Sequence, residues 1–298
     1  MKSVGTVREL WRYPVKGMAG ERVDATAVGA SGLAGDRQWA VRETARREIQ
    51  SCKRHPRLLE CVASYATTSP ADGVVAPVRI RFPDGSESSS EDPEIHARLS
   101  RLLGTEVTLE HLRPASDADF YRRFNRGGEA WRDDLAATFA REPGEPLPEF
   151  FAAMPLEVRE FIGVPGSFFL VTPLHLITTA TLARLRAWNA ASDWDVRRFR
   201  PNIVVETEPV FDGLVEQTWI GARLAVGALR MDCVSATPRC GAITRPGRTA
   251  FRRAASAYRR ARSEPERGRL RRRQGLGHGA RGRRHRARMI SGLACAMR

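Results

Sequence analysis

The stretch WRYPVKGM at residues 11–18 and the stretch GLAGDRQW at residues 32–39 decide the fold that this sequence predicts. The first stretch begins within an apolar run over residues 4–13, which is typical of a β-strand, and Pro14 follows that run directly. Lys16 and Arg37 lie just beyond strand-like runs, because proline and glycine interrupt the strand pattern beside them. Charged side chains in such turns are available to a ligand.

Short strands surround these two stretches in the first 113 residues. Alternating or apolar runs, bounded by Gly, Pro, Asp or Ser, occur at residues 22–29, 36–42, 58–65, 77–82 and 105–111. Short strands at close spacing are typical of a small β-barrel. Residues 92–104 instead have the cap residues and the apolar period of a helix. We therefore expect residues 1–113 to form a β-barrel module with one helix.

The next part of the chain, residues 114–243, predicts a second β-rich barrel with helical insertions. Its expected elements are a helix near 149–162, a strand at 167–171, a helix at 173–188, and strands at 203–207, 222–226 and 229–235. The expected fold class of the whole chain is therefore mainly β with helices (α+β).

The net charge of +15 is concentrated in the carboxy-terminal tail. Residues 244–298 contain 18 arginines, no lysine and two acidic residues, so the rest of the chain is nearly neutral. The tail has no sustained apolar period, and we expect it to be disordered, because burial cannot offset its ordering entropy. Any polyanion binding would reside there. A nucleic-acid partner is not expected, since Phe251 and Tyr258 are the tail's only aromatic residues.

The remaining composition favours a cytoplasmic protein without a membrane segment. The sequence has no run of about 18 apolar residues and no secretory signal pattern. Its five cysteines form no CxxC pair, which argues against structural zinc, a disulfide framework and an in-chain iron–sulfur cluster.

Four further motifs follow in order: LHLITTA at residues 174–180, FRPNIVV at 199–205, WIG at 219–221 and PRC at 238–240. Together with the two opening stretches, they resemble MOSC proteins over residues 1–243. Relatives of this kind include the mitochondrial amidoxime reducing component and the carboxy-terminal domains of molybdenum cofactor sulfurases. The resemblance implies an amino-terminal MOSC β-barrel module, a MOSC β-barrel domain and a molybdenum-molybdopterin cofactor.

The resemblance makes Cys240 the expected catalytic residue and metal ligand. A soft metal favours a thiolate, and the charge of the neighbouring Arg239 favours the thiolate form. The alternative for a lone cysteine is a small buried apolar residue, which is what we expect for Cys52 and Cys233.

The other expected cofactor-binding residues suit a phosphate and a pterin. Arginine and lysine bind phosphate, whereas hydroxyls and amides at a helix start form an anion site and a side-chain amide suits a pterin edge. The alternatives are surface charges, helix caps and hydrogen bonds at a strand edge. The residues are Lys16, Arg37, Thr178, Thr179, Arg200 and Asn202.

The expected function is that of a molybdenum-dependent oxidoreductase, which reduces N-hydroxylated small-molecule substrates. Because the chain has no cysteine cluster of the ferredoxin kind, electrons would come from a separate protein, a ferredoxin or a reductase. One alternative is a sulfur carrier that uses a persulfide on Cys240. Another is an inactive product with an incidental polyanion-binding tail, since the sequence shows no clear strands after Cys240 to close the second barrel.

Overall fold

The computed structural model describes most of the chain before Arg239 and a short segment near its end. The described residues are 3–66, 75–124, 128–139, 141, 143–147, 160–170, 172–227, 229–238 and 289–297. No helix within these ranges has the length and apolar character needed to cross a bilayer. The described structure is mainly β with helices, which confirms the expected fold class.

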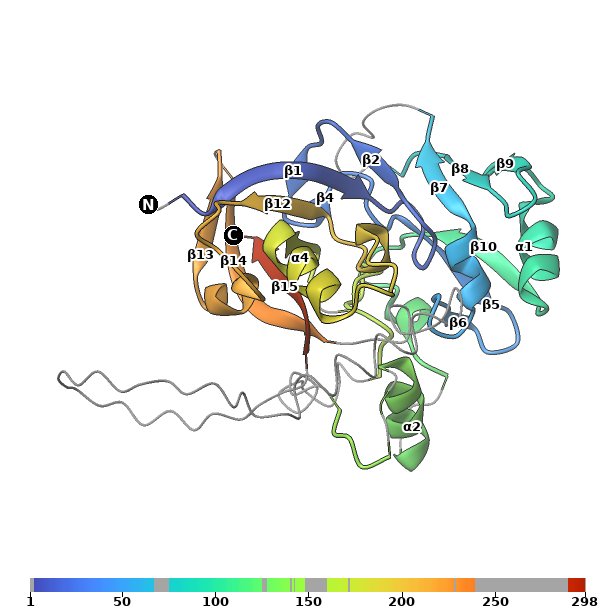
Figure 1. The fold of residues 1–298 in the computed structure, drawn as a ribbon. Helices are drawn as coiled ribbons and strands as arrows, with labels where there is room; N and C mark the ends of the chain where they lie inside the picture. Colours follow the sequence, from blue (N-terminus) through green and yellow to red (C-terminus); the bar gives the residue numbers. More distant parts are fainter. Residues whose placement is uncertain are drawn as a thin grey trace, which may run out of the picture.

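A seven-stranded sheet joins the two ends of the chain. Its strand order is β13-β14-β15-β11-β12-β1-β2. The strands are β1 (Gly5–Arg12), β2 (Glu21–Val23), β11 (Leu174–Thr178), β12 (Ile203–Thr207), β13 (Arg223–Val226), β14 (Leu229–Pro238) and β15 (Met289–Met297). The strand β1 runs antiparallel to β12, with Gly5 opposite Thr207, and Figure 1 shows the two side by side. The sheet therefore contains strands from both sides of the boundary expected near residue 113.

Three small sheets and a helix build the rest of the amino-terminal part. The sheets have the orders β10-β5-β6, β7-β8-β9 and β3-β4. Their bounds are β3 (Val28–Gly29), β4 (Gly32–Leu33), β5 (Trp39–Glu43), β6 (Glu48–Ile49), β7 (Val62–Tyr65), β8 (Val78–Arg81), β9 (Glu87–Ser89) and β10 (Val107–His111). Helix α1 (Ile95–Leu103) buries Ile95 and Leu99 in their core. It ends at Gly104, whose φ of +71° a glycine adopts without steric cost.

The later helices are short and lie beside the large sheet or below it in Figure 1. They are α2 (Gly128–Thr138) and α4 (Thr179–Trp188), with 3₁₀ turns η2 (Ala118–Tyr121), η4 (Val196–Arg198) and η5 (Val215–Trp219). An earlier 3₁₀ turn, η1 (Pro56–Glu60), belongs to the amino-terminal part. Helix α4 packs Leu182 and Leu185 into a cluster with Trp194 and Phe199. This cluster fixes the segment that leads from α4 into β12.

Several sequence expectations are confirmed and three are wrong. Strands occur near each position expected in the first 113 residues and at 203–207, 223–226 and 229–238. The helix expected over 173–188 begins only at Thr179, because residues 174–178 form β11, where their apolar side chains are buried between neighbours in the sheet. No strand occurs over residues 167–170. The helix expected near 149–162 falls mostly outside the described residues.

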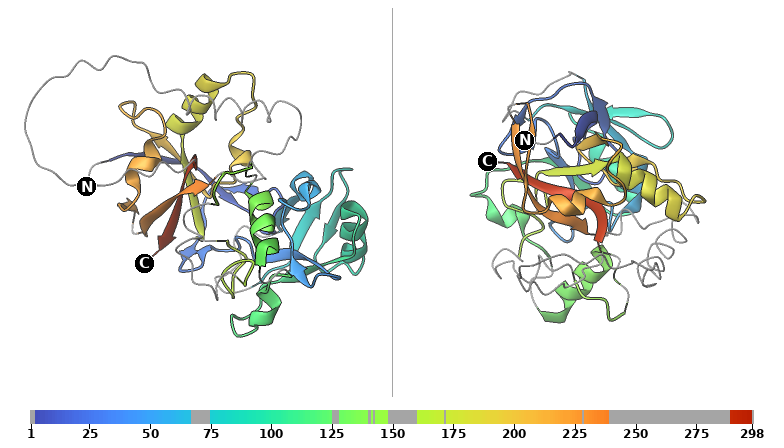
Figure 2. Two further views of the ribbon diagram at one scale, coloured as in Figure 1. Left: turned by 90° about the horizontal axis from the view of Figure 1, so that it is seen from below. Right: turned by 60° about the vertical axis from the view of Figure 1, so that its left-hand side comes forward.

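The expectation that the whole tail is disordered is wrong for residues 289–297. This segment forms β15, which lies antiparallel between β14 and β11 and pairs with both (Figure 2). The tail as a whole is rich in arginine, but its segment MISGLACAM at residues 289–297 has no charged residue. This segment can therefore join a sheet without burying a charge. A strand therefore covers edges of β11 and β14 that the sequence analysis expected to be open.

Candidate functional site

One pocket brings together most of the residues expected to bind a cofactor. Its volume is about 450 Å³, and its lining includes Lys16, Arg37, Arg200 and Asn202. These residues come from turns after β1 and β4 and from the turn before β12. The pairing of β1 with β12 brings the turns that follow β1 and precede β12 to the same place, although they are far apart in the sequence.

Two arginines lie against one tyrosine ring in this pocket. The guanidinium carbon of Arg200 is 4.3 Å from the centroid of the Tyr13 ring, and that of Arg37 is 5.1 Å from it. The Tyr13 hydroxyl donates to the carbonyl oxygen of Pro201 at 3.1 Å, which fixes the ring. Each guanidinium group is attracted to the negative face of this ring, so the ring holds both of them beside it. The pair therefore presents concentrated positive charge to a ligand.

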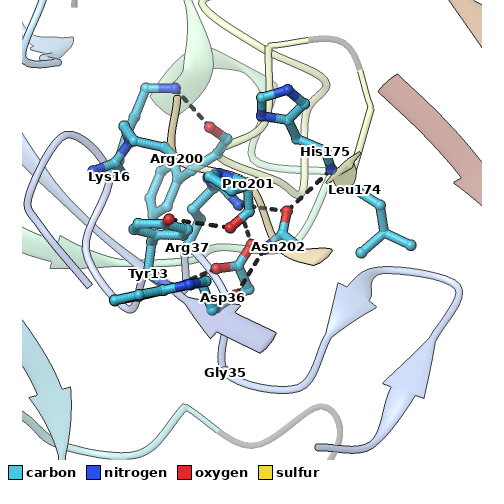
Figure 3. Close-up of polar contacts among 12 residues, drawn as sticks. Tyr13, Lys16, Gly35, Asp36, Arg37, Leu174, His175, Arg200, Pro201 and Asn202 are labelled. Carbon is cyan, nitrogen blue, oxygen red and sulfur yellow. Dashed lines mark hydrogen bonds and ion pairs between the residues drawn. The ribbon is translucent and has the colours of Figure 1, made fainter. Parts of the chain in front are cut away.

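A buried polar network positions Arg37 (Figure 3). Asp36 is 2% exposed, accepts from the Tyr13 amide at 2.7 Å and forms an ion pair with Arg37. The side-chain nitrogen of Asn202 donates to Asp36 at 3.0 Å and to the Trp11 carbonyl at 3.2 Å. Its side-chain oxygen accepts from the His175 amide at 3.2 Å and from Arg37 at 3.4 Å. Both ends of the Asn202 amide are thus used within the protein.

Lys16 reaches the pocket with a lowered pKa. Its Nζ donates to the carbonyl oxygen of Phe168 at 2.6 Å. Burial, and after it the charges of Lys53 and Arg37, together lower the pKa of Lys16 to about 7. An anion in the pocket would raise this pKa again, so Lys16 can take up a proton when an anion binds.

Thr178 and Thr179 lie at the start of α4, as expected, but neither lines the pocket. The Thr178 hydroxyl caps α4 by accepting from the Thr181 amide at 3.1 Å. A carboxylate of the protein, that of the fully buried Glu216, accepts from the Thr178 amide at 2.5 Å and from the Thr181 hydroxyl. The helix start therefore binds an anionic group that belongs to the chain itself.

Cys240 lies outside the described residues. The last described residue before it is Pro238, at the end of β14. Two side chains of the same strand, Ser235 and Thr237, line the pocket. Cys52 and Cys233 are buried in hydrophobic core clusters, as expected, and Cys52 also borders the pocket.

The sequence analysis did not single out Tyr13, His175 or Lys53 as site residues. Tyr13 and His175 stand within the quoted motifs, and Lys53 is one of three lysines at positions 2, 16 and 53, so signals for each existed. Burial and the nearby Arg37 lower the pKa of His175 to about 4, which keeps its ring neutral. Its Nε2 atom is buried and lacks a hydrogen-bond partner within the described part of the chain.

The pocket's chemistry fits a ligand that carries a phosphate and a polar ring system. Lys16, Arg37 and Arg200 supply charge for a phosphate. Within the described residues, His175 Nε2 and Thr237 Oγ1 are buried and have no hydrogen-bond partner, and a ligand with ring nitrogens and oxygens would offer polar partners for them. A substitution that added a Cβ at Gly17 would bring it within 2.8 Å of the Cys52 amide nitrogen, so the loop after Lys16 is packed tightly against the pocket wall.

Two models of protein families match this chain. A model described as the MOSC N-terminal beta barrel domain matches residues 4–108, and one described as the MOSC domain matches residues 167–291. The second match runs past residue 243, where the resemblance was expected to end, and reaches β15. A search of the curated proteins finds no match for this chain.

MOSC domains are associated with proteins that bind the molybdenum cofactor. The two family matches together cover most of the chain. The chain therefore belongs to the MOSC family and combines an amino-terminal MOSC β-barrel domain with a MOSC domain.

Proposed function

We propose that this protein binds the molybdenum-molybdopterin cofactor in the pocket lined by Lys16, Arg37 and Arg200 and acts as a molybdenum-dependent oxidoreductase. The observation that carries the proposal is the convergence of these three cations, from turns far apart in the sequence, on one cavity. A cofactor phosphate carries two negative charges, and guanidinium groups bind it through paired hydrogen bonds.

Each residue near the cavity has a distinct role in this proposal. Arg37 and Arg200 bind the phosphate, and Lys16 takes up a proton as the anion enters. Asn202 and Asp36 hold Arg37 in place, because their own polar groups already bond within the protein. The buried His175 Nε2 accepts a hydrogen bond from the pterin, since its ring is neutral.

Cys240 is the proposed ligand of the metal. It is three residues beyond Thr237, which lines the pocket, and an extended chain of three residues spans about 11 Å at most. The thiol is therefore close enough in the chain to reach the cavity. Thr178 and Thr179 remain predicted cofactor-binding residues only through the family resemblance, since the pocket lining does not include them.

When bound, this cofactor supplies two-electron removal of oxygen from an N-hydroxylated small molecule. The chain binds and orients the two molecules and excludes water through the apolar part of the pocket wall. Electrons are supplied by a separate ferredoxin or reductase, and the protein acts in the cytoplasm.

Molybdenum content tests this proposal directly. The full chain, Cys240→Ala and Arg200→Gln are produced in a host that makes the cofactor, and metal and pterin are measured in each. Arg223→Gln is the matched control, because Arg223 pairs with Asp232 at the edge strand β13, away from the pocket. We expect metal and pterin in the wild type and the control, loss of metal in Cys240→Ala, and loss of both in Arg200→Gln. A folded wild type without metal but with a persulfide on Cys240 would overturn the proposal in favour of sulfur transfer.

A further inference from the structure

Two cysteines that are far apart in the sequence lie opposite each other in the large sheet. The strands β14 and β15 are antiparallel, and their register sets Cys233 directly opposite Cys295. The preceding pair, Asp232 with Ala296, has the same register, and the register shifts only after Cys233. The two cysteines are therefore opposed in the regular part of this strand pair.

The main chain of Cys233 makes its hydrogen bonds on the side away from β15. Its amide donates to the carbonyl oxygen of Ala222 at 2.9 Å, and its carbonyl oxygen accepts from the amide of Gly221 at 2.7 Å. In an antiparallel sheet, a residue that directs both groups to one neighbouring strand forms a non-hydrogen-bonded pair with the other, and the Cα atoms of such a pair are about 4.5 Å apart. A disulfide requires a Cα separation of about 4.4–6.8 Å. The register is therefore compatible with a disulfide at this position.

The two cysteine positions also belong to the buried face of the sheet. Leu174 of β11 is opposite Cys295 on the other side of β15, so the three positions form one row across β11, β15 and β14. Leu174 and Cys233 are each 1% exposed and belong to the same hydrophobic cluster. Directly opposed residues of neighbouring strands share one face of a sheet. A bond at Cys233 would therefore lie in the core, where dissolved thiols have little access to it.

We propose that Cys233 and Cys295 form a disulfide that cross-links β14 and β15 under oxidising conditions. The oxidant is a low-molecular-weight disulfide such as glutathione disulfide. One cysteine thiolate attacks it and releases a first glutathione, and the second cysteine then attacks the mixed disulfide and releases the other. The two protein thiols lose two electrons to the oxidant, and their two protons end on the two glutathione thiols. An excess of glutathione reverses both steps.

The cross-link stabilises a part of the sheet that borders the pocket. Ser235 and Thr237 follow Cys233 on β14 and line the pocket. A disulfide between residues as far apart in the sequence as Cys233 and Cys295 stabilises the fold, because it restricts the unfolded chain. It leaves Cys240 as a thiol, so the inference does not depend on the proposed metal ligand and does not compete with it.

Peptide mapping tests the inference, because trypsin separates the two cysteines. Cleavage after arginine gives peptides 231–239 and 289–298 with one cysteine each, and Cys240 falls in a third peptide. The full chain is equilibrated with glutathione disulfide and alkylated, and the monomer is isolated on a non-reducing gel and digested. We expect peptides 231–239 and 289–298 to be joined, and dithiothreitol to separate them. Cys233→Ala and Cys295→Ala should lose the joined peptide. Cys61→Ala should keep it and is the matched control, because Cys61 is buried in a different cluster.

Urea unfolding provides the second measurement. We expect oxidation to raise the urea midpoint of the wild type and of Cys61→Ala, and to leave those of Cys233→Ala and Cys295→Ala unchanged. Oxidised wild type in which both cysteines are still alkylated, or in which Cys295 is joined to Cys240, would overturn the inference. A joined peptide that forms equally well in concentrated urea would also overturn it, because the fold would then not select this pair.

Discussion

Replacing Asp36 with asparagine should destabilise the protein and loosen the pocket at the same time. The Asp36 carboxylate accepts from the Tyr13 amide at 2.7 Å and from the Asn202 side chain at 3.0 Å, and it pairs with Arg37, whose side chain is 15% exposed. Asparagine has the same shape but only one acceptor oxygen. In the variant, Arg37 therefore lies near Arg200 without its buried counter-charge. The new side-chain NH₂ group also replaces one acceptor oxygen, so it faces another N–H donor, that of the Tyr13 backbone or of the Asn202 side chain.

The expected cost is about 3 kcal/mol, at the lower end of the range for breaking a buried ion pair, because the other hydrogen bonds of Asn202 persist. Urea unfolding followed by tryptophan fluorescence measures it. Asp212→Asn is the control, since Asp212 is 76% exposed in its ion pair with Arg184 and such pairs contribute about 0–1 kcal/mol. A cost for Asp36→Asn no larger than that of the control would refute the view that this network holds the pocket together.

Three further predictions concern the pH dependence and the end of the chain. The pKa of Lys16 is lowered to about 7, mainly by burial, so its charge is lost as the pH rises through that value. The affinity of the pocket for sulfate should therefore fall roughly tenfold between pH 6 and 8. The same fall in a titration of Lys16→Gln would contradict this prediction. Burial raises the pKa of Glu216 above its ordinary 4.5, so the folded state holds that proton more tightly and its stabilisation declines as the pH rises. Glu216→Gln should therefore flatten the dependence of the urea midpoint between pH 5 and 8, and an unchanged slope would show that another group causes it. Deleting residues 289–298 exposes the facing edges of β11 and β14, and size-exclusion chromatography should show aggregates that deletion of Arg298 alone does not produce; a monomeric truncated chain would argue against the pairing of β15.

The sequence was sufficient to predict the strands of the amino-terminal part, because each is short, alternating and bounded by turn residues. It failed over residues 174–178, where Leu174 and Ile177 fit a helical spacing with Leu182 and Leu185, although Leu174 and Leu176 also fit a strand. Only the sheet resolves this ambiguity, since β11 lies between β12 and β15 and is buried there. The sequence did not predict β15, because the composition of residues 244–298 as a whole is dominated by arginine, although residues 289–297 carry no charge.

The candidate site divides in the same way between local and long-range information. Lys16, Arg37 and Arg200 could be named because they stand at recognisable positions in motifs. The role of Asn202 could not, because the two acceptors of its side-chain nitrogen, Asp36 and Trp11, are more than 160 residues away in the sequence. A motif thus indicates which residues meet, but the hydrogen bonds decide which of them still has a free group to offer a ligand.

The backbone at the two arginines shows why the pocket needs two distant parts of the chain. Arg37 and Arg200 have φ angles of +50° and +53°, a left-handed conformation that costs a residue other than glycine about 1–3 kcal/mol. Such strain persists only where the surroundings hold it. Asp36 and Asn202, which are 166 residues apart, do so, while the Tyr13 ring lies against both guanidinium groups. Neither part alone supplies all of these contacts. The pairing of β1 with β12 therefore both extends the sheet and places the two arginines at the same ring before any anion binds.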